Sequence, residues 1–359
     1  MENKRICVIS PSLQMGGIER QLTILSAHFI KRGHDVHFIA CRAGKHFYEL
    51  DSRVHFVEPP FVHTTKASSK LFSYYKTISF IRKQIKRIKP DTIMVFGDII
   101  NPIALIANKG LGYPIYIADQ ISPKQNLGRF KNFMKRITYR SATGIIAQSK
   151  MAADYKYEVF GNDINVRIIP NTMRDIVDCP DVEKHPWIVS LGRLSYEKGV
   201  DRLIDAFSRI SEHDDWRLVL IGDGPQRNQL EEQVKKLNIS DRVDFLGGQN
   251  DVDALLAQSS IFVLPSRCEG FPNALCEAMA SPLPCITFDS VSASDIIDNH
   301  ISGEIVRDGD IEGLSSAILS LMDDKSKRDK YASNAYTIRE RLEKNKVGDM
   351  FLDFILEKL

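Results

Sequence analysis

The regular alternation of short strands with helices constrains the fold of this chain more than any other feature of its sequence. Apolar runs that read as strands lie at 4–10, 36–40, 92–96, 115–118, 144–147 and 166–170. Between them, apolar residues recur at helical spacing, as from Ile18 to Phe29. Because strand and helix alternate many times, we expect a mostly parallel sheet covered by helices on both faces. The sequence therefore predicts a doubly wound α/β fold.

The alternation breaks once and then starts again. Residues 171–186 are polar and show little apolar periodicity, so we expect a linker there. Further strands are predicted at 187–191, 218–221, 243–246, 261–264 and 285–288, and only helices after about 310. The predicted parts are a Rossmann-like domain over 1–172, a second over 173–344, and a C-terminal helix over 345–359 that returns to the first domain. Two such domains leave a cleft, and ligands bind beyond the carboxyl ends of the strands.

Composition excludes several other classes of protein. The chain has 359 residues, of which 43% are hydrophobic, so it can bury a large core and is not disordered. No apolar run approaches the roughly 20 residues of a membrane-spanning helix, and the N-terminal run is too short for a signal peptide. The six cysteines have no zinc-binding spacing. We expect a cytoplasmic protein with reduced thiols, no metal site and no cofactor.

The two parts of the chain carry opposite charge. Residues 1–170 hold 26 Lys and Arg against 12 Asp and Glu, a net of +14, and the remainder has a net of −12. Basic residues accompany apolar ones at helical spacing around 66–89, and a second basic cluster lies at 129–140. Basic amphipathic helices bind anionic membrane surfaces. The sequence therefore predicts peripheral binding to an anionic membrane through the first domain. No nucleic-acid partner is expected, because no nucleic-acid-binding module is recognised.

The strongest chemical motif runs from Glu269 to Glu277, directly after the predicted strand 261–264. Gly270 permits close backbone approach, and Pro272 is suited to the first turn of a helix. The amides at that helix start can bind an anion. Both carboxylates can face a ligand seated there and accept hydrogen bonds from vicinal hydroxyls, as in ribose or a sugar.

Three further elements accompany this motif. Arg193 and Lys198 follow the strand 187–191, and their charges would offset the repulsion between two carboxylates and a diphosphate. Gly16 and Gly17 follow the first strand and open a helix, which suits close approach to a phosphate. An Asp251-Val252-Asp253 run resembles a metal-binding motif, but it precedes a helix and is interpreted as helix capping.

Together these motifs resemble glycosyltransferase family 4. The resemblance rests on the Glu269–Glu277 element, the segment from Gly192-Arg193-Leu194 to Lys198-Gly199, the loop Gly222-Asp223-Gly224-Pro225, Ile169-Pro170-Asn171 and the N-terminal Gly16-Gly17 pair. It spans nearly the whole chain. Members of this family are retaining enzymes with the two-domain GT-B fold, and many build bacterial surface polysaccharides or lipid-linked glycans.

The resemblance also implies residue roles. Arg193 and Lys198 would hold the donor diphosphate without a divalent cation, Glu277 the ribose, and residues 247–250 the base. Arg193, Lys198 and Glu269 would act in catalysis. The transferred sugar would contact Glu269 and the backbone of Gly270, Phe271, Pro272 and Asn273. Relatives often carry a histidine-containing pair after the strand at 115–118, where this chain has Asp119-Gln120, so a histidine role does not carry over. Asp119, with Asp98 behind it, is predicted to contact the acceptor.

The predicted function is transfer of a hexose or N-acetylhexosamine from a nucleotide diphosphate sugar to a saccharide or polyprenyl-linked glycan. A UDP donor carrying GalNAc, GlcNAc or galactose is favoured over GDP-mannose. The alternatives are a GT-B sugar-nucleotide epimerase, a phosphorylase, and a non-catalytic nucleotide-sugar-binding protein. An epimerase needs no acceptor and a phosphorylase responds to inorganic phosphate, so the assays differ.

Overall fold

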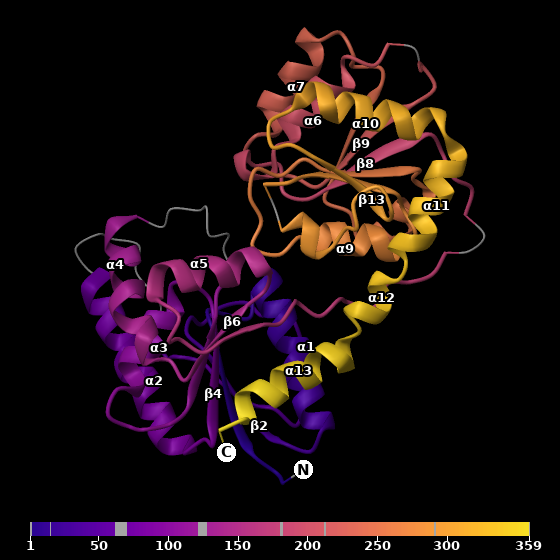
Figure 1. The fold of residues 1–359 in the computed structure, drawn as a ribbon. Coiled ribbons are helices and arrows are strands. Elements are labelled where there is room, and N and C mark those ends of the chain that lie inside the picture. The colour runs from indigo at the N-terminus through magenta and orange to yellow at the C-terminus, as the bar shows by residue number, and fades with distance from the viewer. Residues whose placement is uncertain are drawn as a thin grey trace. The chain divides into compact units, whose positions relative to one another are not determined.

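The structure of the chain is a computed structural model that describes residues 2–14, 16–61, 70–120, 128–179, 182–211, 213–290 and 292–358. The chain divides into two compact units: Met1–Thr172 together with Leu342–Leu359, and Met173–Arg341 (Figure 1). The sequence placed these divisions after 172 and after 344. No helix among the described residues combines the length and hydrophobicity that a membrane-spanning segment requires.

The first unit is built on a seven-stranded sheet in the order β3-β2-β1-β4-β5-β6-β7, with every recorded pairing parallel. The strands are β1 (Arg5–Ser10), β2 (Asp35–Ala40), β3 (His55–Val57), β4 (Thr92–Phe96), β5 (Ile115–Ala118), β6 (Gly144–Ala147) and β7 (Val166–Ile168). The predicted strands of this unit are confirmed, and β3 is an addition. It is a three-residue strand at the sheet edge that begins with His55, so it has no run of apolar residues to mark it.

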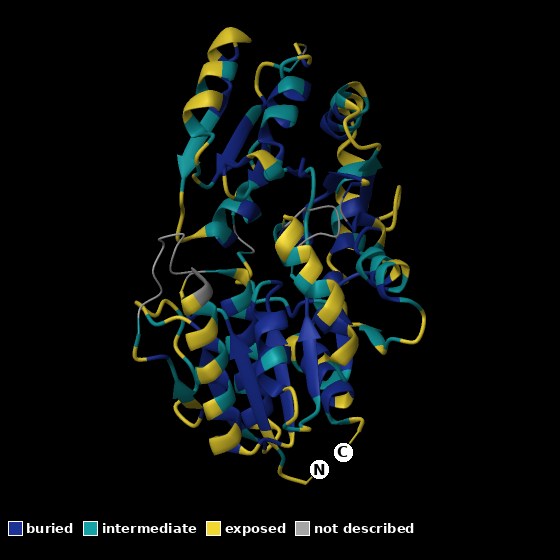
Figure 2. Ribbon diagram, turned by 90° about the vertical axis from the view of Figure 1, so that its left-hand side faces the viewer, coloured by how far each residue is buried: buried dark blue, intermediate teal, exposed yellow. Residues whose placement is uncertain are grey.

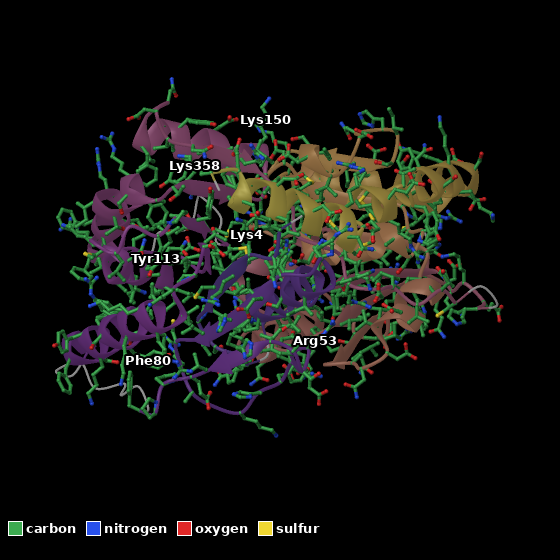
Figure 3. The ribbon with its side chains drawn as sticks, turned by 90° about the horizontal axis from the view of Figure 1, so that it is seen from below. Lys4, Arg53, Phe80, Tyr113, Lys150 and Lys358 are labelled. Carbon is green, nitrogen blue, oxygen red and sulfur yellow. The ribbon has the colours of Figure 1, made fainter. Side chains whose placement is uncertain are left out.

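Helices cover both faces of this sheet. They are α1 (Gly17–Lys31), α2 (Lys70–Ile88), α3 (Ile100–Asn108), α4 (Arg129–Thr138) and α5 (Lys150–Phe160). Alternate residues of β1 enter different cores: Ile6 and Val8 pack with α1, whereas Cys7 and Ile9 pack with α2 and α3. Phe80 and Tyr113, labelled in Figure 3, border the second of these cores. Strands buried on both faces account for the continuous apolar runs in the sequence.

The C-terminal helix α13 (Lys344–Leu356) packs on this first unit. Phe351 contacts Phe96 with ring centroids 5.9 Å apart, and Phe354 meets Tyr116 edge to face at 5.0 Å. His28 of α1 lies 2.8 Å from the Asp349 carboxylate. The apolar face predicted for this segment is therefore buried against α1 and the sheet, although the whole of the other unit, Met173–Arg341, separates it in sequence from Thr172.

The second unit has a six-stranded sheet in the order β10-β9-β8-β11-β12-β13, again with every recorded pairing parallel. Its strands are β8 (Trp187–Leu191), β9 (Arg217–Ile221), β10 (Val243–Gly247), β11 (Ile261–Leu264), β12 (Cys285–Phe288) and β13 (Gly303–Val306). The predicted strands are confirmed, and β13 is an addition. Figure 2 shows most strands buried, with exposed stripes on the helices, whereas the edge strands β3, β7 and β10 are partly exposed.

The helices of the second unit are α6 (Val200–Phe207), α7 (Arg227–Lys236), α8 (Val252–Gln258), α9 (Asn273–Ala280), α10 (Ile311–Asp323), α11 (Lys325–Ala335) and α12 (Ile338–Arg341). In both sheets the chain leaves a central strand in one direction and later returns to its other side. These reversals lie between β1 and β4, and between β8 and β11. Loops diverge at such points, so each sheet has a natural ligand position at its carboxyl edge there.

Candidate active site

The predicted donor residues converge at the reversal point of the second sheet. β8 and β11 are direct neighbours, with Val189 paired to Phe262. Arg193 and Lys198 follow β8, and Glu269 follows β11. The strand order thus brings together residues that are about 70 positions apart in sequence.

Lys198 and Glu269 form an ion pair. The Lys198 Nζ lies 2.6 Å from Oε1 of Glu269, and the Ser266 hydroxyl donates to the same oxygen at 2.8 Å. Both charged side chains are largely buried, with 26% and 11% of their surface exposed. Ser266 holds the carboxylate from its own loop, so Glu269 keeps a fixed position if Lys198 moves.

Two glycines let the loops around this pair pack backbone against backbone. Gly199 has φ +63°, and an added Cβ would overlap the carbonyl oxygen of Pro265. Gly222 has φ +130°, and an added Cβ there would overlap the carbonyl oxygen of Gly192. The glycine-rich loop at 222–225 therefore packs directly against the loop that carries Arg193. Its glycines are explained by this close packing.

Helix α9 begins beside this pair. Pro272 is the residue before the helix and Asn273 is its first residue, one position later than the sequence suggested. Gly270 and Phe271 lie in the preceding loop, and Phe271 is buried with 6% of its surface exposed. Backbone amides at the start of α9 can bind an anion, as predicted for this helix.

Glu277 lies in the second turn of α9 and is contacted by an arginine that the sequence analysis did not single out. The Arg174 guanidinium lies 3.2 Å from Oε2 of Glu277. It also forms a two-pronged pair with Asp253, one arm measuring 2.9 Å. Asp251 caps α8 by accepting from the Ala254 amide, so its capping role is confirmed, whereas Asp253 binds Arg174. No local motif marks Arg174, because its partners are 79 and 103 residues away.

Arg193 is exposed and free to reach an incoming anion. Burial acts against ionisation of neighbouring Glu197, but the nearby Ser195 side chain and the charges of Arg193 and Lys198 outweigh it and lower the pKa of that carboxyl. The loop after β8 therefore favours negatively charged groups at the carboxyl edge of the second sheet.

The other predicted residues belong to the first unit. Gly16 precedes α1 in an extended conformation, and Gly17 is its first residue, directly beyond β1. An added Cβ at Gly16 would overlap the Glu19 carboxylate, whose other oxygen accepts from Ser12 at 2.7 Å. A side chain at position 16 would therefore require the Glu19 carboxylate to move. Phosphate contact by Gly16 and Gly17 stays a prediction.

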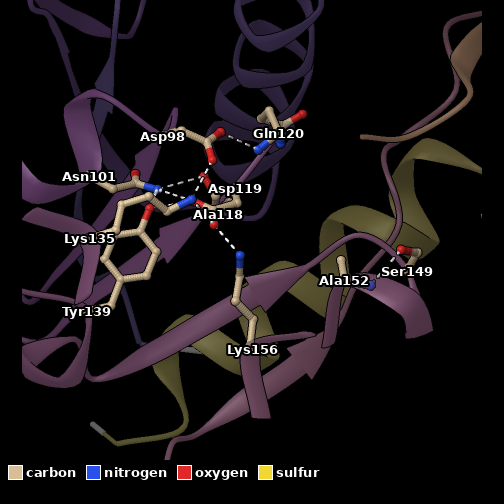
Figure 4. Close-up of polar contacts among 10 residues, drawn as sticks. All are labelled: Asp98, Asn101, Ala118, Asp119, Gln120, Lys135, Tyr139, Ser149, Ala152 and Lys156. Carbon is tan, nitrogen blue, oxygen red and sulfur yellow. Dashed lines mark hydrogen bonds and ion pairs between the residues drawn. The ribbon is translucent and has the colours of Figure 1, made fainter. Parts of the chain in front are cut away.

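Asp98 and Asp119 lie in a buried charge cluster at the carboxyl ends of β4 and β5 (Figure 4). The Lys135 Nζ bridges them at 2.8 and 2.9 Å. Asp119 also receives bonds from Lys156, from the Tyr139 hydroxyl and from Asn101 at 3.0 Å. Because Asp119 accepts hydrogen bonds from several protein donors, it is also suited to positioning those side chains. Its contact with the acceptor stays a prediction.

Burial and the two lysines set the ionisation of this cluster. Burial and the charge of Asp119 raise the pKa of Asp98 to about 6, although Lys135 acts in the opposite direction. Burial also disfavours the charged form of Asp119, but Lys156 and Lys135 outweigh it and hold its pKa well below the usual range. Asp119 is therefore ionised at neutral pH and Asp98 titrates near pH 6.

Among the described residues, one group of side chains is close enough to share a metal ion: Asp35, His37 and His55. It lies at the amino ends of β2 and β3, away from the edge that holds the predicted site. Arg5 already donates to Asp35 Oδ2 at 2.9 Å. A guanidinium at this carboxylate disfavours a cation there.

Comparisons with known proteins agree with this architecture. Residues 15–173 match the family model described as Glycosyltransferase Family 4, and residues 176–338 match the model described as Glycosyl transferases group 1. The crystal structure of Anabaena HepE in complex with UDP has TM-score 0.80 at 18% identity, over 99% of this chain and 100% of that one. Two α/β domains with these motifs define a GT-B glycosyltransferase.

Within that class, the chain belongs to the family 4 type of glycosyltransferases. A Campylobacter jejuni relative is 26% identical over 357 residues, 98% of each chain, and is named as a GalNAc-α-(1→4)-GalNAc-α-(1→3)-diNAcBac-PP-undecaprenol α-1,4-N-acetyl-D-galactosaminyltransferase. An Escherichia coli relative is 24% identical over 83% of this chain and 84% of its own, and is named as a UDP-Gal:α-D-GlcNAc-diphosphoundecaprenol α-1,3-galactosyltransferase. The predicted family, fold class and enzyme class are confirmed.

Proposed function

We propose that this enzyme transfers a hexose or N-acetylhexosamine from a nucleotide diphosphate sugar to a saccharide or lipid-linked saccharide, with retention at the anomeric carbon. The observation that carries the proposal is the Lys198–Glu269 pair at the reversal point of the second sheet, beside the start of α9. At this edge of the sheet, a cation is suited to bind the diphosphate and a carboxylate is suited to bind the sugar hydroxyls. These two parts of the donor lie on either side of the bond that reacts.

The donor is a UDP-sugar. HepE, which shares the fold, binds UDP, and the E. coli relative takes UDP-Gal by name. The C. jejuni relative transfers GalNAc. These names support GalNAc, GlcNAc or galactose on UDP ahead of GDP-mannose.

Catalysis follows from the charge that develops as the donor bond breaks. The bond from the anomeric carbon to the phosphate oxygen breaks, and its electron pair stays on the diphosphate. Arg193, Lys198 and the amides at the start of α9 stabilise that charge as fixed donors, and no metal ion is needed in this scheme. The acceptor oxygen bonds to the same face of the anomeric carbon, and its proton passes to the departing phosphate oxygen.

Glu269 and Lys198 separate when the donor binds. Lys198 turns toward the diphosphate, while Ser266 keeps Glu269 in place for a sugar hydroxyl. The pair seen here thus keeps both charges compensated before substrate arrives. This gives Ser266 a positioning role that no sequence motif indicated.

The acceptor is linked to a lipid. Both transferase relatives carry undecaprenol-linked acceptors in their names. Helix α4 of this chain exposes Phe130, Phe133 and Ile137, with 60%, 59% and 55% of their surfaces accessible, between the basic residues Arg129, Lys131 and Arg136. Exposed apolar residues flanked by cations fit a peripheral contact with an anionic membrane surface. Of the other predicted basic cluster, at 66–89, Lys66 lies outside the described residues and the rest lies in and just after α2.

A thermal-shift panel of UDP, GDP, ADP and their sugars tests the donor class. A ligand of the native state at 100 times its Kd stabilises the protein by about 2.7 kcal/mol. We expect UDP and a UDP-hexose or UDP-N-acetylhexosamine to raise Tm, and slow hydrolysis of that sugar nucleotide without acceptor. Stabilisation by GDP or ADP alone would overturn the UDP assignment, and absence of any shift would overturn the donor site.

A further inference from the structure

Arg174 joins two buried carboxylates in the second unit. Asp253 and Glu277 have 8% and 9% of their side-chain surfaces exposed, and Arg174 has 24%. Arg174 Nη1 donates to Asp253 Oδ2 at 2.9 Å, and Nη2 contacts both Asp253 Oδ1 and Glu277 Oε2. The Val177 amide donates to the same Asp253 oxygen at 2.9 Å. The guanidinium is therefore held on one side by Asp253 and presented to Glu277 on the other.

The charges in this triad depend on one another. Two buried carboxylates near a diphosphate are unfavourable unless a cation accompanies them. Burial acts against the charge of Arg174, but the hydrogen bond to Asp253 and the attraction of Glu277 and Asp253 prevail and raise its pKa above the ordinary value. A planar guanidinium also fixes the direction of the carboxylate that it contacts, which a lysine ammonium does less well.

We propose that Arg174 is a positioning residue that holds the Glu277 carboxylate in the orientation that reads the ribose hydroxyls of the donor, with Asp253 holding Arg174. This rests on the proposed function, in which Glu277 contacts the ribose. Arg174 lies two residues beyond Thr172, the last residue of the first unit before the chain crosses over. The residue proposed to orient Glu277 therefore lies, in sequence, next to the point where the chain passes from the first unit to the second.

Calorimetric titration with UDP and with 2′,3′-dideoxy-UDP tests this role, since the second nucleotide lacks both ribose hydroxyls. A hydrogen bond to a charged group is strong enough for the wild type to prefer UDP by about tenfold or more. We expect Arg174→Met to reduce that preference to about threefold or less. Most of the loss should fall on UDP, with dideoxy-UDP bound about as before. Arg174→Lys should restore part of the preference.

Two further variants make the result specific. Arg174→Met leaves two buried carboxylates without their cation, so the double variant Arg174→Met/Asp253→Asn removes one of them and should fold while still lacking the preference. Arg339 is a matched control, because it has 22% of its side chain exposed, pairs with Asp178 and bonds the carbonyl of Ala280 at the opposite end of α9. Arg339→Met should keep the full preference.

The outcomes separate the two proposals. A wild type that does not bind UDP contradicts the proposed donor and with it this role. If the wild type binds UDP and dideoxy-UDP equally, the protein does not recognise the ribose hydroxyls, which contradicts the proposed contact of Glu277 with the ribose. A folded Arg174→Met variant that keeps the wild-type preference overturns the role of Arg174 alone.

Discussion

At the scale of single residues, the candidate residues of each unit carry opposite charges that compensate one another before substrate binds. Lys198 pairs with Glu269, Arg174 pairs with both Glu277 and Asp253, and Lys135 bridges Asp98 and Asp119. Each pair places a hydrogen-bonding group at a carboxyl edge without an isolated buried charge.

Replacing Lys198 should separate its catalytic role from folding. We expect Lys198→Ala to lower kcat for donor hydrolysis or transfer by about 100-fold to 1000-fold, since a preorganised donor to the leaving group is lost. The far-ultraviolet circular dichroism spectrum should not change. Lys236→Ala, on the exposed last turn of α7, is the control and should keep wild-type turnover. A Lys198→Ala enzyme with near wild-type kcat would remove Lys198 from the mechanism.

The raised pKa of Asp98 predicts a pH-dependent stability. Because the folded state favours the protonated form, Asp98 stabilises the fold below about pH 4, and this contribution is lost as pH rises through about 6. Urea unfolding of wild type and Asp98→Asn between pH 4 and 7 measures it. The wild type should lose about 2 to 3 kcal/mol relative to the variant over this range. Parallel stability curves would contradict the assignment.

The donor motifs could be located from the sequence because each is local, and the structure has them directly after β8 and β11. That they bind the donor stays a prediction. Arg193 and Lys198 lie in one short segment after a strong strand pattern, and Glu269 and Glu277 lie in the loop and the helix that follow another. The sequence did not predict Arg174, Ser266 as a support for Glu269, or the lysines that engage Asp119. These contacts come from strand order and helix packing, which no single stretch of the chain encodes.

At the scale of elements, helix α4 presents apolar residues outward, as α2 does at Phe72 and Tyr75. Its exposed Phe130, Phe133 and Ile137 accompany Lys135, which anchors the helix to the sheet through Asp98 and Asp119. An amphipathic pattern in sequence does not say whether its apolar stripe faces a core or solvent. The basic cluster at 129–140 was recognised from sequence, but the exposure of these side chains was not.

Helix α4 gives a direct test of membrane binding. The triple variant Phe130→Ser/Phe133→Ser/Ile137→Ser should reduce co-sedimentation with vesicles of anionic phospholipid by about tenfold or more, because burial of each large apolar side chain is worth about 1.5 to 3 kcal/mol. Transfer to a soluble acceptor should persist. Val177→Ser/Ile301→Ser removes exposed apolar residues from the second unit and should sediment like wild type. If the triple variant binds the vesicles as well as the wild type does, or if the wild type does not bind them at low salt, α4 is excluded as a membrane-binding surface.

At the scale of the whole molecule, the strand and helix alternation was sufficient to predict two parallel-sheet domains. The strands β3 and β13 escaped because His55 in the first and Glu304 in the second interrupt a short apolar run, and both are edge strands. The opposite net charges of the two parts of the chain are associated with different structural features. The basic part carries α4, and the acidic part carries a few cations placed at the reversal point of its sheet.

Calorimetric titration of UDP in the presence of EDTA tests most directly whether these side-chain cations, rather than a metal ion, hold the donor diphosphate. The wild type is predicted to bind UDP with the same affinity with and without EDTA, and Lys198→Ala to bind at least about tenfold more weakly under both conditions, since a charge-assisted hydrogen bond is lost. UDP binding that disappears in EDTA and returns with manganese, or a Lys198→Ala variant with wild-type affinity, would contradict the account.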